Sequence, residues 1–162
     1  MDFIAAEKYV AEHRAEIIES LCRFFATDTL LFWSDEPDLF AYQKTHWQPL
    51  LDKLNTVFKI ELKITTTLIP PENNKALLQY KKQLETISDK ELTVCRIAAA
   101  ETKSVLLGLL LAKQQMKAKE AYNAAYLEEI YQNKFWGEDV AAVNARNNSR
   151  EILENLERYL QE

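Results

Sequence analysis

The stretch 88–113 constrains the fold more than any other part of the chain. It joins a helix start signal to dense apolar content, SDKELTVCRIAAAETKSVLLGLLLAK. Ser88 and Glu91 have the spacing of a capping box, in which each side chain accepts the other residue's backbone N–H. Its apolar residues, on more than one helical face, are Val94, Ile97, Ala98, Val105, Leu106, Leu109 and Leu110. Such a helix needs neighbours on several sides, so we predict a central buried helix over about 88–113.

Charge and composition place this helix in an all-α domain and not in a membrane. Arg96, Glu101 and Lys103 interrupt the stretch, and each charge at the middle of a bilayer costs about 2.5–3.5 kcal/mol. Two glycines and four prolines in 162 residues leave little material for tight turns. Ala, Leu, Glu, Lys and Gln are abundant and favour helix. We therefore predict a single helical domain over 1–162, a bundle of five to six helices without membrane insertion.

The remaining helices follow from apolar spacing and from start and stop signals. We expect them at 2–26, 37–58, 72–87 and 117–136, and from Glu138 or Asp139 to about Leu160. Pro49 lies inside the second of these and predicts a kink near Thr45, whose carbonyl loses its partner. Gly137 predicts a left-handed C′ position that ends the helix over 117–136.

Residues 58–65 change period. Phe58, Ile60, Leu62 and Ile64 alternate with polar residues, which indicates a strand or extended segment. No other segment has a matching period, and an unpaired strand leaves backbone groups without partners. We therefore expect something outside the chain to cover the segment, such as a second molecule in a weak homodimer.

Several function classes lack the residues they need. A net charge of −5 without a basic run disfavours nucleic acid as a partner. Glycine occurs only at 108 and 137, so phosphate-binding loops and nucleophile elbows are excluded. His13 and His46 have no ligand at metal spacing, and Cys22 and Cys95 are expected to be reduced core residues. We expect no metal, no cofactor and no enzyme.

Two features remain as candidates for function. Glu101 lies among alanines and leucines, where a buried carboxylate could act as an acid or base; an exposed helix face is the favoured alternative. The tetrad Trp136-Gly137-Glu138-Asp139 combines an aromatic residue, a turn glycine and two acids at a helix start. It is either a capped turn or a binding site, and the residues alone leave both open.

The chain resembles a known family through motifs that keep their order and spacing from about residue 12 to 158. They are Ala26-Thr-Asp-Thr-Leu-Leu-Phe-Trp33, Gln43 with Trp47-Gln-Pro-Leu-Leu51, Thr102 to Ser104 with Leu107-Gly108-Leu109, and Trp136-Gly-Glu-Asp139. Together they resemble the helical domain of the assembly chaperones for the ATP synthase alpha subunit. Lys103 departs from the family, which usually has a small residue there.

The resemblance implies a chaperone that binds the unassembled alpha subunit and prevents its aggregation. It also implies a β-rich N-terminal domain, and nothing in this chain corresponds to one. Residues 2–16 carry four acids, unlike a signal or transit peptide. We therefore expect a bacterial cytoplasmic protein, whereas eukaryotic relatives work in the mitochondrial matrix.

Three hypotheses follow: the alpha-subunit chaperone, a helical interaction or scaffold protein with a different client, and an enzyme that uses Glu101. For the first we predict a client-binding region at Glu138 and Asp139, placed by Trp136. The alternative location is an exposed polar turn from Asn144 to Arg150, with Arg146 and Arg150 as contacts.

Overall fold

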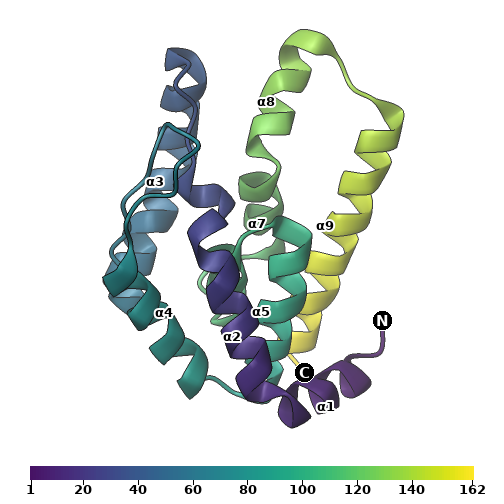
Figure 1. The fold of residues 1–162 in the computed structure, drawn as a ribbon. Coiled ribbons are helices and arrows are strands. Elements are labelled where there is room, and N and C mark those ends of the chain that lie inside the picture. The colour runs from purple at the N-terminus through teal and green to yellow at the C-terminus, as the bar shows by residue number, and fades with distance from the viewer.

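The computed structural model describes residues 1–162 and is all-helical, as predicted (Figure 1). The α-helices are α1 Phe3–Glu12, α2 Arg14–Phe24, α3 Pro37–Phe58, α4 Asn74–Thr86, α5 Asp89–Thr102, α6 Val105–Ala112, α7 Ala118–Ala125, α8 Leu127–Trp136 and α9 Val140–Leu160. Two 3-10 turns, η1 Phe25–Thr27 and η2 Thr29–Leu31, follow α2. None of the helices is both long and apolar enough to span a membrane.

The predicted central helix over 88–113 is in fact two helices, α5 and α6. The capping box of Ser88 and Glu91 is present as predicted, with N···O distances of 3.0 and 3.1 Å. The helix ends, however, because Lys103 adopts a left-handed conformation with φ of 56°. Ser104 then caps α6 by accepting a hydrogen bond from the backbone N–H of Leu107. The error is a missed cap, since Ser104 carries the usual N-cap chemistry.

Gly108 lets α6 fold back closely onto α5. A Cβ atom at Gly108 would lie 2.9 Å from the carbonyl oxygen of Cys95, and the Cys95 thiol donates to the carbonyl of Gly108 at 3.7 Å. Every residue of α6 is buried. The centre of the molecule is therefore a helical hairpin, and burial raises the pKa of the Cys95 thiol.

Asp28 holds the N-terminus of α6. Its carboxylate accepts hydrogen bonds from the backbone N–H groups of Leu30 and Leu106, each at 2.9 Å, and from the Ser104 hydroxyl at 2.8 Å. Burial raises the Asp28 pKa to about 6, although these hydrogen bonds oppose the shift. One fully buried carboxylate thus caps both η2 and α6.

Two further predicted helices are also divided. The helix over 2–26 breaks at His13, and the helix over 117–136 breaks at Tyr126; neither break contains glycine or proline. By contrast, α3 continues through Pro49 without a break. The expectation of five or six helices was therefore too low, because tertiary packing ends helices that the apolar pattern continues.

Part of the segment 58–65 finds backbone partners within the chain, whereas we had predicted partners outside it. The backbone N–H of Trp33 donates to the carbonyl of Thr65 at 2.9 Å, and Thr65 N–H donates to Leu31 at 2.8 Å. The Asn73 side chain binds both the N–H and the carbonyl of Lys63. This is one isolated parallel bridge and not a sheet. Ile60 is fully buried.

Candidate functional site

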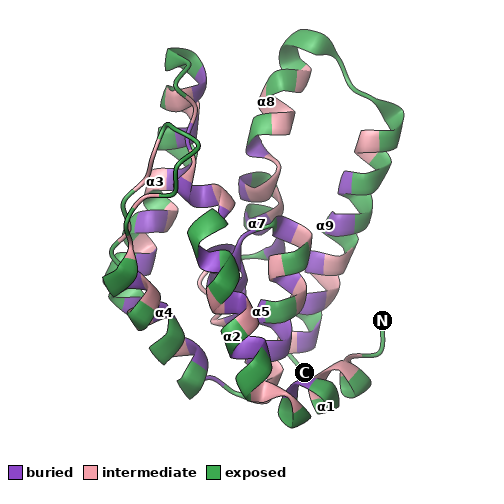
Figure 2. Cartoon of the chain, viewed as in Figure 1, coloured by how far each residue is buried: buried purple, intermediate pink, exposed green.

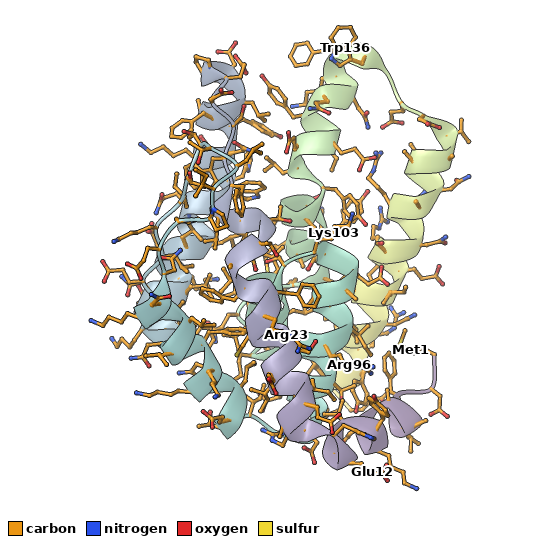
Figure 3. All side chains as sticks on the ribbon, in the orientation of Figure 1. Met1, Glu12, Arg23, Arg96, Lys103 and Trp136 are labelled. Carbon is orange, nitrogen blue, oxygen red and sulfur yellow. The ribbon has the colours of Figure 1, made fainter.

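The turn between α8 and α9 stands at one extreme of the molecule and is exposed along its length (Figures 1 and 2). We call residues 135–140 the tip. Its three large apolar side chains are more exposed than hydrophobic residues usually are: Phe135 is 67% exposed, Trp136 86% and Val140 74%. Figure 3 shows Trp136 at this end. The tip is therefore an apolar surface that the chain does not cover.

The backbone of the tip follows the local sequence. Gly137 has a positive φ of 78°, as expected, but its ψ of 177° is extended and not the predicted left-handed value. Asp139 caps α9 by accepting the backbone N–H of Ala141 at 2.9 Å, so the predicted start of the last helix is confirmed. A cap leaves one carboxylate oxygen of Asp139 free, and Glu138 is exposed.

Arg146 closes the hairpin from inside. The predicted polar turn from Asn144 to Arg150 is wrong, because these residues form regular turns of α9 and Arg146 is only 5% exposed. Its guanidinium lies 2.8 Å from the Glu129 carboxylate of α8 and 3.5 Å from that of Glu138. The side-chain amide of Asn133, with its oxygen and nitrogen exchanged, also fits this arrangement. Its oxygen then accepts a hydrogen bond from the Arg146 guanidinium, and its nitrogen donates one to the carbonyl of Gly137.

We had predicted that Trp136 fixes the position of Glu138 and Asp139, but in the structure it does not. Its side chain is 86% exposed, so it cannot fix a turn by packing. The ion pairs of Arg146 and the cap at Asp139 provide that fixation. The Trp136 side chain is left exposed.

An aromatic strip connects the tip to α3. The ring centroids of Tyr42 and Tyr131 are 5.1 Å apart, and those of Tyr131 and Phe135 are 5.3 Å apart. The Lys134 ammonium lies 4.8 Å from the centroid of Tyr42, within the range of a cation–π contact. Phe135 is therefore held at one side, while most of its surface remains open.

The sequence analysis did not identify Phe135 and Val140 as candidate site residues. Their adjacency or spacing gave no usable signal, because adjacent apolar residues such as Leu106 and Leu107 are both buried in α6. Arg150, the remaining predicted contact, is exposed and pairs with Glu154 on its own helix.

Glu101 is occupied by a structural contact. Its carboxylate accepts the Ser149 hydroxyl of α9 at 2.8 Å, and Ser149 in turn accepts the Tyr126 hydroxyl at 2.8 Å. This network ties α5 to α9 and to the junction of α7 and α8. The arrangement joins three elements, and it places the Tyr126 hydroxyl where it also donates to the backbone carbonyl of Glu101 at 3.4 Å.

Comparison with known proteins gives a family match over part of the chain and a shared fold over nearly all of it. Residues 2–55 match a family described as ATP12 chaperone protein. Atp12 from Paracoccus denitrificans has the same fold, with a TM-score of 0.90 and 25% identity over 97% of this chain and 68% of that one. A single-substitution variant of that protein matches with a TM-score of 0.88. The Agrobacterium tumefaciens protein Atu1473, described as a candidate chaperone, matches at 0.81 with 24% identity. The last alignment covers 96% of this chain and 59% of that protein.

Proposed function

We infer that this chain, a relative of the ATP12 chaperones, is an assembly chaperone that binds the unassembled alpha subunit of ATP synthase. The observation that carries the inference is the shared fold with Atp12 over 97% of the chain, together with the family match at residues 2–55. No catalytic chemistry is part of the proposal. We also propose a bacterial cytoplasmic location, since the similar structures come from bacteria.

We propose the tip as the surface that meets the client. An unassembled subunit exposes apolar surface that a later partner will cover, and a chaperone must offer apolar surface in exchange. Phe135, Trp136 and Val140 offer it, and tryptophan is the residue most enriched in interface hot spots. Glu138 and Asp139 add negative charge beside them, suited to basic groups on the client.

Arg146 and Arg150 have different places in this proposal. Arg146 is buried, so it supports the tip through Glu129 and Glu138 and does not meet the client directly. Arg150 is exposed on α9 and can lie at the rim of the interface.

Co-expression with the alpha subunit, scored as soluble alpha subunit, tests the function. We expect the wild-type chain to raise soluble alpha subunit and to co-purify with it. The double change Phe135→Ser and Trp136→Ser should remove both effects. Leu78→Ser on α4 is the matched control, because Leu78 is 62% exposed and distant in sequence. No gain in soluble alpha subunit with the wild-type chain would contradict the function itself.

Charge reversal tests the acids separately. Glu138→Lys with Asp139→Lys should abolish co-purification while far-UV helicity is kept. Because Asp139 also caps α9, Asp139→Ser serves as a control that keeps a capping oxygen and removes the charge. Binding that survives the double reversal would move the client contact away from these acids.

In the alternative, a helical scaffold protein, a different client binds the same tip. A pull-down in which the alpha subunit is absent and another protein depends on Trp136 would favour it. Self-association through residues 58–65 stays a prediction. Its motive was a set of unpaired backbone groups, and Leu31, Trp33 and Asn73 already form hydrogen bonds with some of them. Hydrogen exchange there that slows with protein concentration would support a dimer.

A further inference from the structure

A groove of about 570 Å³ lies between α2 and α5, away from the tip. One wall is formed by Leu21 and Phe24 of α2. The other follows one face of α5 and the residue after it, in the order Arg96, Ala99, Ala100 and Lys103. Arg96, Ala99 and Ala100 have the spacing of a single face of α5, and Lys103 follows at the end of the helix, so the groove runs along α5. Ala99 and Ala100 form the floor of the groove and make it apolar.

Phe24 keeps an apolar side chain at the mouth of this groove. It is 61% exposed, although its neighbour Phe25 is 2% exposed in the core. A large aromatic side chain at the edge of an apolar groove gains free energy when a partner covers it. Phe24 is thus a natural first contact for an occupant of the groove.

Cations stand at both ends of the floor, and no carboxylate lines the groove. Neither Arg96 nor Lys103 forms an ion pair. Arg96 lies 4.7 Å from the Tyr9 ring centroid, and with Arg23 and Glu16 it lines a smaller neighbouring hollow. Figure 3 labels Arg23, Arg96 and Lys103 on these elements. In a chain of net charge −5, this is a local positive surface.

Lys103 has the left-handed conformation that glycine or asparagine adopts at lower cost. Its backbone is fixed there, because its carbonyl accepts hydrogen bonds from the backbone N–H and the hydroxyl of Thr29. The fold needs only the backbone of this residue. The lysine side chain therefore adds a cation at the groove end that the turn itself does not require.

We propose that this groove binds an amphipathic helix of a protein partner, with two carboxylates about two turns apart on either side of small apolar residues. Arg96 and Lys103 are seven positions apart, or about 10 Å along a helix axis, and two acids at i and i+7 have the same separation. An apolar face between the acids covers Ala99, Ala100 and Phe24. This is helix-in-groove recognition with charges that fix the register.

A labelled synthetic peptide tests the proposal on the full chain by fluorescence anisotropy. The probe is a helix of about fifteen residues with Glu at two positions seven apart, Leu and Ala between them, and Gln elsewhere. We expect saturable binding that weakens with salt. A peptide with Lys in place of both Glu should not bind.

Protein variants locate the site. Lys103→Glu and Arg96→Glu should each weaken binding at least about tenfold, the range of one lost close charge pair. Ala100→Phe should block the floor. Lys82→Glu on α4 has the same charge change on an exposed lysine outside the groove and should leave affinity within about twofold.

Three results would overturn the proposal. The first is no peptide binding by the wild-type chain at any salt concentration. The second is equal binding of the Glu and Lys peptides, or unchanged binding by Lys103→Glu. The third is self-association of the chain that Arg96→Glu abolishes, because the occupant would then be a second copy.

Discussion

Two helical hairpins in this protein have opposite roles. The α5–α6 hairpin closes on itself: every residue of α6 is buried, and Gly108 brings the backbones into contact. The α8–α9 hairpin has a single buried residue in α8, Leu127, and an exposed apolar tip. Both are two helices joined by a short turn. The difference lies in what surrounds them, since burial of α6 stabilises the fold whereas the exposed tip contributes little to it.

The turns of the two hairpins differ in the same way. Asp28 and Ser104 hold the α5–α6 turn through fully buried hydrogen bonds. The α8–α9 turn is held from one side by Arg146, and a Cβ atom at Gly137 would meet nothing within 4 Å. The first turn can tolerate little change in side-chain volume, and the second can tolerate much.

The largest expected difference between the two hairpins is the loss of stability when a large apolar side chain is shortened to alanine. Leu109→Ala should lower the free energy of unfolding by about 2–5 kcal/mol, because it leaves a cavity in a fully buried helix. Urea denaturation measures the loss. Phe135→Ala at the tip is the matched change, and a loss of similar size there would show that the two hairpins do not differ as described.

The pH dependence of Asp28 comes next. Its pKa rises from an ordinary value of 3.8 in the unfolded chain to about 6 in the folded one, so the folded state holds the proton more tightly. The stability from this group is fully present below about pH 4 and is lost as pH rises to about 6, in total about 3 kcal/mol.

Unfolding free energies at pH 4.5 and pH 7 measure this change, and the Asp28→Asn variant isolates it. The variant should be less stable overall but should lack the decrease between the two pH values. Glu91 acts in the opposite direction: burial raises its pKa, but the Ser88 N–H and Lys113 outweigh burial and lower it. If the variant and the wild type change equally with pH, Asp28 is not the group responsible.

The two glycines give a smaller contrast. Gly108→Ala should cost about 1–3 kcal/mol, because the new methyl group would meet the backbone of Cys95. Gly137→Ala meets no neighbouring atom, but a φ of 78° with a ψ of 177° is a backbone conformation that is essentially limited to glycine, so backbone strain alone should cost about 1–3 kcal/mol. Thermal unfolding of both variants measures the two losses, and an unchanged melting temperature for Gly137→Ala would show that this turn does not need its glycine.

The smallest stability effect should accompany the largest functional one. Trp136→Ala should change the free energy of unfolding by less than about 0.5 kcal/mol, since the side chain is 86% exposed. The same variant should reduce the amount of alpha subunit that co-purifies. A stability loss above about 1 kcal/mol would mean that Trp136 packs in solution and is not a free contact.

Much of the fold was predictable wherever a signal was local. The capping box at Ser88, the start of α3 at Pro37 and the start of α9 after Asp139 all depend on residues within one turn. The breaks at His13 and Tyr126 have no such signal. They depend on how the following segment packs, which a periodic pattern does not contain.

The candidate site was predictable only in part. The tetrad from Trp136 to Asp139 drew attention to the tip, but Trp136 was assigned an anchoring role that Arg146 fulfils. Arg146 lies ten residues from Trp136 in the sequence. Its role depends on α9 lying beside α8, which sequence spacing alone did not establish.

The sequence by itself determined an all-α chain and the helix starts that carry a local cap, because propensity, caps and apolar spacing act within a few residues. Only the tertiary structure decided that residues 58–65 pair with Leu31 and Trp33, that Asp28 caps α6, and that the tip is left uncovered. The first two join residues distant in the chain, and the third depends on what packs beside the turn. Their free energies depend on burial and on which backbone groups find partners, and both are set only when the helices pack.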